Sequence, residues 1–356
     1  AVILHTSGTT GLPKRVPRSH RTFVEAARAA RHCTNLTPAD VVLLATGLFT
    51  NSGIGHMISG LLNGGSCVIT SGFEPTQFPD WLEAHRPTWT VSTATELNLM
   101  LDAAARVGRE TIAGPGSRLR AVRVGAQAMT PGTVERAERS LGAPLFEGYG
   151  LSEASNIAKS GPGPEDRRPG SCGRPMHRSI AVRILDDAGE DAAPGKPGEV
   201  VVRGPTVFSG YLDDAEANEA AFLPGGWFRT GDVGYVDEEG FLYLSGRLSE
   251  LMNRGGEMIA PAEVDRVLQG HPAVAEAAVF AVPDARLGED IVAAVVVNPK
   301  TSASARELRV WMLERLTPSK VPRRIWMTGS LPRTETGKVQ RAELARRWSE
   351  QHASAP

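Results

Sequence analysis

AVILHTSGTTGLPK, residues 1–14, changes in character part-way along its length. The apolar first part is typical of a short buried strand, and the second part is a run of hydroxyls and glycines that ends at Lys14. Glycines allow several backbone N–H groups to point at one anion, hydroxyls add donors, and Lys14 adds a mobile positive charge. The stretch therefore predicts an anion-binding loop that follows a strand.

The spacing within this loop argues against one well-known kind of phosphate loop. A Walker loop joins glycine directly to lysine and enters a helix at once. Here Lys14 stands three residues after Gly11, and Pro13 intervenes. A surface turn rich in small residues is the alternative. The position of this loop directly after an apolar strand favours anion binding over a plain turn.

The bulk properties are those of an ordinary globular protein. The 356 residues carry a net charge of −1, with 22% charged and 41% hydrophobic residues, and can form more than one domain. The sequence has no basic excess to neutralise nucleic-acid phosphates and no apolar run long enough to cross a bilayer. Cys33, Cys67 and Cys172 lack the spacing of metal ligands. We therefore expect a cytoplasmic protein with no nucleic-acid or membrane partner.

The order of apolar segments predicts an α/β fold in two domains. Up to about residue 161, strand-like runs alternate with helical patterns, which predicts mostly parallel sheets covered by helices. Prolines then punctuate short strands, which predicts a small β-barrel-like or antiparallel region over about 162–247. We place the domain boundary after Arg247, so that residues 248–356 form a smaller α+β domain.

A second motif, EGYGLSE at residues 147–153, follows a predicted strand at 144–146. Its side chains therefore belong at the carboxyl edge of the sheet, where open α/β folds bind ligands. The alternative is a helix entry that is capped by Ser152.

Two further regions carry charged residues in glycine-containing loops. WFRTGDVGY at residues 227–235 puts Asp232 on a tight turn, where a carboxylate can accept hydrogen bonds from two hydroxyls at once, and GFLYLSGR at 240–247 ends at Arg247. LPRTETGKV at 331–339 carries Lys338 near the C-terminus. Taken singly, these would be a turn residue, a solvated arginine and a solubilising lysine.

Together these motifs resemble, in type and in order, those of the adenylate-forming (AMP-binding) enzymes, in particular acyl-CoA synthetases of the 4-coumarate–CoA ligase kind. The resemblance covers essentially the whole chain. It implies that ATP activates a carboxylic acid as an acyl-adenylate, which then forms a thioester with coenzyme A, with Mg²⁺ as cofactor. It also implies that residues 1–247 are the remainder of a large adenylation domain, whose first segment is absent or is a separate chain, and that 248–356 form a mobile lid.

The resemblance also implies roles for single residues. Lys338, Glu153 and Thr9 would be catalytic, and Glu153 would hold Mg²⁺. Tyr149 would lie on the adenine ring, and Asp232 and Arg247 would contact the ribose. The implied ATP-binding set is Thr6, Ser7, Gly8, Thr10, Gly11, Lys14, Gly125, Ala126, Gln127, Tyr149, Gly150, Ser152, Asp232 and Arg247.

The acid pocket, the CoA tunnel and the hinge are implied in the same way. The tunnel would be lined by Gly255 and Gly256, and the hinge would be Ser249, where the family often has aspartate or lysine. The pocket hints at a modest, partly polar acid, although its polar side chains could instead satisfy backbone groups. The implied pocket set is Phe49, Thr50, Asn51, Ser155 and Asn156.

Three other functions stay open on the sequence alone. The acyl group could pass to the phosphopantetheine thiol of a carrier protein. The chain could be a non-catalytic nucleotide-binding subunit, or it could be an oxidase of the luciferase kind.

Overall fold

The computed structural model describes residues 1–6, 13–125, 129, 131–161, 163–176, 180–298, 301–333 and 339–352. The chain forms two compact units, Ala1–Leu244 and Ser245–Pro356. The division falls inside strand β14 (Leu242–Arg247), slightly before the boundary expected after Arg247. Within the described ranges, no helix is long and apolar enough to cross a membrane.

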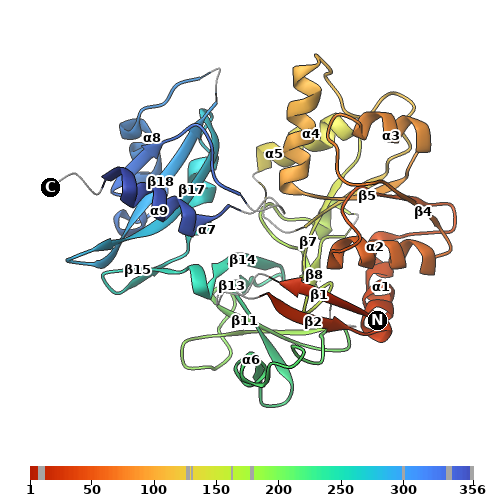
Figure 1. The fold of residues 1–356 in the computed structure, drawn as a ribbon, viewed down its shortest axis with the longest axis horizontal. Coiled ribbons are helices and arrows are strands. Elements are labelled where there is room, and N and C mark those ends of the chain that lie inside the picture. Colours follow the sequence, from red (N-terminus) through yellow and green to blue (C-terminus); the bar gives the residue numbers. More distant parts are fainter. Residues whose placement is uncertain are drawn as a thin grey trace. The chain divides into compact units, whose positions relative to one another are not determined.

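A seven-stranded sheet is the main element of the first half of the first unit (Figure 1). Its order is β4-β3-β5-β6-β7-β8-β9; the strands from β4 to β7 run parallel, and β8 and β9 are antiparallel. The mostly parallel sheet that the alternating pattern predicts is confirmed. The strands are β3 (Val41–Leu44), β4 (Ser66–Ile69), β5 (Trp89–Thr93), β6 (Ala121–Gly125), β7 (Leu145–Tyr149), β8 (Ala158–Lys159) and β9 (Arg174–Pro175).

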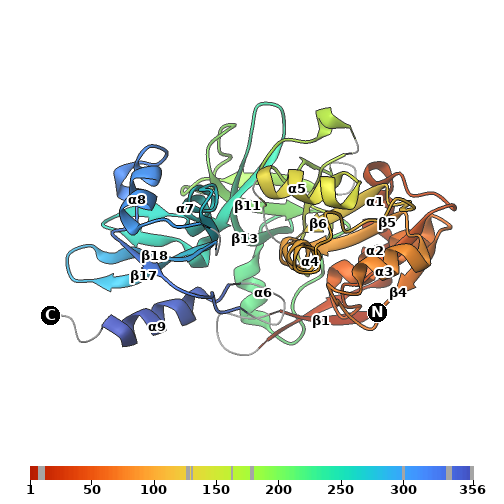
Figure 2. The same cartoon turned by 90° about the horizontal axis from the view of Figure 1, so that it is seen from above.

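Helices cover both faces of this sheet (Figure 2). On one face, α3 (Phe78–His85), α4 (Ala94–Arg106) and α5 (Pro131–Leu141) pack around Val122 and Val124. On the other face, α2 (Asn51–Leu62) packs near Ala121 and Phe146. Alternate residues of one strand point to opposite faces, so β6 contributes side chains to both cores.

The first strand of the chain is not part of the seven-stranded sheet. β1 (Val2–Thr6) pairs antiparallel with β2 (Lys14–Arg18) as a hairpin. Leu4 is buried but Ile3 is 48% exposed, so the expectation of a fully buried strand is wrong. Helix α1 (His20–Thr34) begins at Ser19, whose side chain accepts from the Thr22 N–H, and it packs against α2.

An antiparallel sheet completes the first unit, as the proline-rich region predicts. Its order is β10-β11-β13-β12, with β14 paired to β13. Val200 and Phe228 from this sheet share a core with Tyr149 and Ile157, so it packs against the segment that follows β7. The elements are η1 (Pro164–Asp166), β10 (Ala181–Leu185), β11 (Gly198–Arg203), α6 (Ala215–Ala221), β12 (Phe222–Leu223) and β13 (Trp227–Val236).

The second unit is an α+β domain around one mixed sheet of order β16-β15-β18-β17, with β19 parallel to β18. α7 and α8 pack with Val279, and α9 packs with Phe280, because neighbouring residues of β17 face opposite sides. The elements are η2 (Leu248–Glu250), β15 (Met252–Arg254), β16 (Glu257–Ile259), α7 (Pro261–Gln269), β17 (Val274–Asp284), β18 (Gly288–Val297), α8 (Ala305–Leu313), η3 (Pro318–Lys320), β19 (Arg324–Met327) and α9 (Arg341–His352).

Candidate functional site

The predicted anion-binding loop connects the two strands of the β1–β2 hairpin. Thr6 and Lys14 are register partners across this hairpin, so they mark the two ends of the loop. An antiparallel pair holds these ends close together, as a loop that wraps around one anion requires. The remaining predicted loop residues, Ser7, Gly8, Thr9, Thr10 and Gly11, lie outside the described residues.

Lys14 and Glu153 are joined by a tyrosine that the sequence did not point to. The Nζ atom of Lys14 lies 4.7 Å from the centroid of the Tyr211 ring. The Tyr211 hydroxyl donates to Oε1 of Glu153 at 3.1 Å. Glu153 is nearly buried, at 9% exposure. The loop lysine and the predicted magnesium ligand therefore both contact Tyr211, the lysine over the face of the ring and Glu153 at the hydroxyl.

Tyr149 and Asp232 are in direct contact. The Tyr149 hydroxyl donates to Oδ2 of Asp232 at 2.5 Å. Asp232 is buried, and its N–H donates to Oγ1 of Thr230. Gly231 has φ +69°, and the pairing of β11 with β13 shifts register here, so the predicted tight turn is a β-bulge. The bulge aims the aspartate at the end of β7.

Arg18 fixes the segment that carries Ser152 and Glu153. It is fully buried, and its guanidinium donates to the carbonyl oxygen of Ser152 at 2.6 Å and to Oγ of Ser155 at 3.0 Å. It also donates to Thr206 O at 3.1 Å. Burial lowers the pKa of Arg18 to about 10, whereas the charge of Glu153 opposes that shift. The arginine thus stays charged at neutral pH and balances a nearby carboxylate.

Neither Arg18 nor Tyr211 was predicted from the sequence. Arg18 left no clear signal, because the KRVPR sequence of β2 does not read as a strand, although in the structure Val16 and Arg18 share its buried face. Tyr211 left none, because its contact with Glu153 joins positions 58 residues apart.

The residues expected around the acid have local structural partners. Oγ1 of Thr50 caps α2 by accepting from the Gly53 N–H. Asn51 donates to Leu151 O at 2.8 Å and accepts from the Ser155 hydroxyl at 2.9 Å. Asn51 and Ser155 are therefore brought together, from the start of α2 and from the segment after β7.

The other two residues predicted for the acid pocket are Asn156 and Phe49. Asn156 has φ +53° and donates to Ala26 O, which ties its turn to α1. Phe49 is 79% exposed. Gly125 ends β6, and a Cβ atom on Gly150 would lie 3.0 Å from the Asn156 nitrogen. Ala126 and Gln127 lie outside the described residues.

The remaining predicted residues belong to the second unit. Arg247 is the last residue of β14, and Ser249 lies in η2. Gly255 and Gly256, at φ +62° and +95°, form the loop of the β15–β16 hairpin. Positive φ at both positions of a two-residue loop is itself a reason for the glycines. Lys338 lies outside the described residues.

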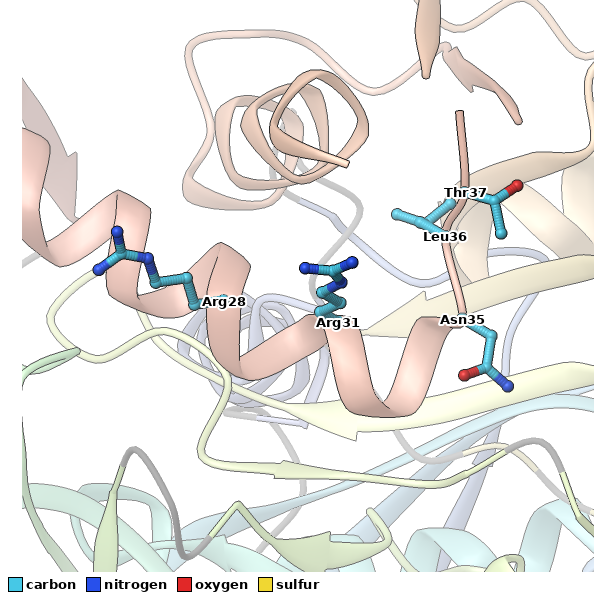
Figure 3. Close-up of a pocket in the computed structure, with 5 residues that line it drawn as sticks. All are labelled: Arg28, Arg31, Asn35, Leu36 and Thr37. Atoms are coloured by element: carbon cyan, nitrogen blue, oxygen red, sulfur yellow. The ribbon is translucent and has the colours of Figure 1, made fainter. Parts of the chain in front are cut away.

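A separate hollow lies at the C-terminal end of α1 (Figure 3). It encloses about 750 Å³, and none of the residues predicted for nucleotide or acid lines it. Arg28 and Arg31 enter it from α1, and the rest of its lining comes from the segment after the helix. The lining is Arg28, Arg31, Asn35, Leu36 and Thr37.

The candidate site fits Mg²⁺ in one respect. Glu153 supplies a nearly buried carboxylate beside Lys14 and Tyr211, and Mg²⁺ is commonly held by one or two carboxylates together with phosphate oxygens and water. Over the described part of the chain, no group of three or more His, Cys, Asp or Glu side chains could hold a metal ion. A single carboxylate suits a metal that arrives with a nucleotide.

Two family models match the chain. The family model described as AMP-binding enzyme matches residues 1–212. The chain belongs to this family. The model for the AMP-binding enzyme C-terminal domain matches residues 263–338 in the second unit, so both units have counterparts in the family.

Two of the named relatives are CoA ligases for small acids. The chain is 36% identical over 358 residues to the oxalate–CoA ligase of Arabidopsis thaliana, covering 98% of this chain and 68% of that protein. It is 36% identical to the sulfoacetate–CoA ligase of Cupriavidus necator, covering 97% and 66%. The chain thus spans about two thirds of the length of these relatives.

A solved structure also matches. The O-succinylbenzoate coenzyme A synthetase from Bacillus subtilis, in complex with ATP and a magnesium ion, superposes with a TM-score of 0.83 at 33% identity. The match covers 96% of this chain and 69% of that one. The predicted fold and the predicted enzyme class, an AMP-forming acid–thiol ligase, are confirmed by these comparisons.

Proposed function

We propose that this chain activates a carboxylic acid with ATP as an acyl-adenylate and then transfers the acyl group to coenzyme A. The observation that carries the proposal is the pair of contacts Tyr149–Asp232 and Tyr211–Glu153. Tyr149 is the last residue of β7, Glu153 follows four residues later, and Lys14 adjoins the second pair. Residues that the proposal assigns to nucleoside and phosphate come from distant parts of the sequence and lie close together here, which supports the proposal.

Each residue has a proposed task at this segment. Tyr149 offers a ring to the adenine, and Asp232 accepts hydrogen bonds from the ribose hydroxyls. Lys14 and the hydroxyl of Ser152 face the phosphates. Glu153 holds Mg²⁺, which would neutralise phosphate charge when bound. Arg247 is proposed to reach the ribose from the second unit.

The proposed reaction has two balanced steps. An oxygen of the acid attacks the α-phosphorus of ATP, and pyrophosphate leaves. The sulfur of coenzyme A then attacks the acyl carbon. AMP leaves, and the proton of the thiol passes to solvent. The first step needs alignment and charge neutralisation more than it needs proton transfer. Lys338 is proposed to supply both alignment and positive charge.

The proposed acid is a small one, by analogy with the relatives. Oxalate, sulfoacetate and succinylbenzoate appear in the names of related ligases. Asn51 and Ser155, which meet beside α2, are proposed to form one polar wall of the pocket.

Pyrophosphate exchange into ATP tests this proposal. The purified protein is offered Mg²⁺, ATP and a panel of aliphatic, aromatic and dicarboxylic acids, and we expect exchange that depends on the acid. Asp232→Asn should weaken exchange, whereas Asp187→Asn, on an exposed turn, should not. ATP binding without exchange for any acid would instead favour a nucleotide-binding subunit. Offering coenzyme A and a carrier-protein thiol to the loaded enzyme identifies the acceptor.

A further inference from the structure

Tyr211 belongs to a short arm, residues 210–213, that lies between β11 and α6 and is held by its neighbours. Oδ1 of Asn218, on α6, accepts from the Tyr211 N–H at 2.6 Å, and Nδ2 of the same side chain donates to the Tyr211 carbonyl oxygen at 2.9 Å. Gly210 has φ +127°, and a Cβ atom there would lie 2.9 Å from Oδ1 of Asn218. One amide therefore satisfies both backbone groups of Tyr211, and the glycine before it makes room for that amide.

The arm is also tied to the strand that carries Lys14. Arg15, the next residue of β2, accepts from the Leu212 N–H at its carbonyl oxygen at 3.0 Å. Its guanidinium donates to Leu212 O at 3.3 Å and to Oδ2 of Asp213 at 3.0 Å. Backbone and side-chain hydrogen bonds therefore hold the arm against β2.

Glu153 is held by the segment that leads into the arm. The Phe208 N–H donates to the Glu153 carbonyl oxygen at 2.7 Å, and the neighbouring Ala154 and Val207 form an antiparallel bridge. The Phe208 ring packs edge-on against Tyr211, with centroids 4.9 Å apart. The backbone of Glu153 and the ring of Tyr211 are thus fixed relative to each other, and the direction of the carboxylate is what remains to be set.

Tyr211 contacts two opposite charges without joining them. Nζ of Lys14 lies over the face of its ring, and Oε1 of Glu153 accepts from its hydroxyl. Among the residues that the structure describes, Lys14 forms no ion pair with a carboxylate, and Oε2 of Glu153 accepts no hydrogen bond. An aromatic face and a neutral hydroxyl bind charged groups less strongly than a phosphate or a metal ion does. Both charged groups therefore have a contact that a nucleotide and its metal can replace.

A direct pair between Lys14 and Glu153 would be harder to replace. Opposite charges attract strongly where water is largely excluded, and Glu153 is only 9% exposed. The lysine side chain is long and flexible, so it can turn toward a carboxylate that contacts the same tyrosine. Such a pair would cancel the positive charge proposed to face the phosphates, and it would occupy a carboxylate oxygen that Mg²⁺ needs.

We propose that Tyr211 is a positioning residue that keeps Lys14 and Glu153 from pairing, so that the lysine stays available to phosphate and the carboxylate to Mg²⁺. The ring holds the ammonium group, and the hydroxyl holds Oε1 so that Oε2 is presented to the metal. This inference rests on the proposed function, and it adds a task for a residue that lies outside the sequence motifs.

Calorimetric titration with ATP tests the inference on the complete chain. The ratio of the ATP affinity in saturating Mg²⁺ to the affinity in EDTA gives the contribution of the metal to binding. Tyr211→Phe keeps the ring but loses the hydroxyl, and it should lower this ratio about fivefold. Tyr211→Leu loses both and should lower the ratio about tenfold or more. The matched control is Tyr235→Phe, whose ring stacks on Tyr243 in the antiparallel sheet, and it should leave the ratio unchanged.

Removing the lysine from the leucine variant separates positioning from folding. If Lys14 pairs with Glu153 once the ring is gone, adding Lys14→Met to Tyr211→Leu should restore the ratio to within about threefold of that for Lys14→Met alone. A purely structural defect would instead leave the double variant as poor as Tyr211→Leu.

The outcomes distinguish the inference from the proposed function. An unchanged ratio in Tyr211→Phe, or a double variant no better than Tyr211→Leu, would overturn the inference. Tyr211→Phe is the smaller change, and its ratio decides the matter if Tyr211→Leu does not fold. Wild-type protein that binds ATP with no gain from Mg²⁺ would overturn the task proposed for Glu153, and wild-type protein that binds no ATP would overturn the proposed function itself.

Discussion

Replacing Arg18 with methionine should destabilise the first unit and loosen the nucleotide site together. The guanidinium donates to Thr22 Oγ1 at 3.3 Å as well as to the acceptors at Ser152, Ser155 and Thr206. Methionine keeps much of the volume but removes one donor from each of these acceptors, and Thr206 O then keeps only the Ser155 N–H among the donors that the structure shows. Removing one member of a buried, hydrogen-bonded charge network costs about 3 to 5 kcal/mol.

Urea denaturation followed by circular dichroism measures the loss in free energy of unfolding, and titration with ATP measures the effect on the site. Arg21→Met is the matched control, because Arg21 is exposed on α1 and its loss should change stability by no more than about 0.5 kcal/mol. The reasoning about Arg18 is refuted if both variants unfold at the wild-type urea concentration. It is also refuted if Arg18→Met binds ATP as tightly as the wild type.

Three further predictions concern acid stability, the second unit and the catalytic lysine. Asp40 is buried, and burial opposes its ionisation, but hydrogen bonds led by that from Arg120 lower its pKa. The contribution of Asp40 to stability should therefore be present above about pH 4 and lost at lower pH. Asp40→Asn should flatten the fall in the free energy of unfolding at acid pH, measured by urea denaturation over a series of pH values. Burial raises the pKa of Asp265 to about 6 against the opposing charge of Arg341, so the folded state binds more protons than the unfolded state. The free energy of unfolding should therefore fall as pH rises from about 4 to 6. Asp265→Asn should remove that dependence on pH, and an unchanged dependence would contradict the assignment. Lys338→Ala should suppress adenylation far more than thioester formation from supplied acyl-adenylate, and equal losses in the two assays would count against its proposed role.

The alternation of strands and helices in the seven-stranded sheet was readable because it depends on local periodicity. The hairpin partner of β1 was not readable. Residues 14–18 read KRVPR, in which three charges and a proline hide a strand signal. Its pairing with β1 follows from the reversal of the chain around the loop, which is a tertiary property.

The site divides in the same way. Tyr149, Glu153 and Asp232 could be predicted as site residues because each lies in a distinctive local motif. Tyr211 and Arg18 act through contacts between distant parts of the chain, and no spacing in the sequence records such contacts. Asn51 and Ser155 were both assigned to the acid pocket, which stays a prediction, and their mutual hydrogen bond could not be foreseen.

ATP titration calorimetry tests most directly whether the separate motifs surround one nucleotide. The account predicts one ATP per chain in the presence of Mg²⁺, with Asp232→Asn and Glu153→Gln each weakening that binding about tenfold or more and Asp187→Asn leaving it unchanged. Two independent nucleotide sites, or wild-type affinity in either of the first two variants, would contradict it.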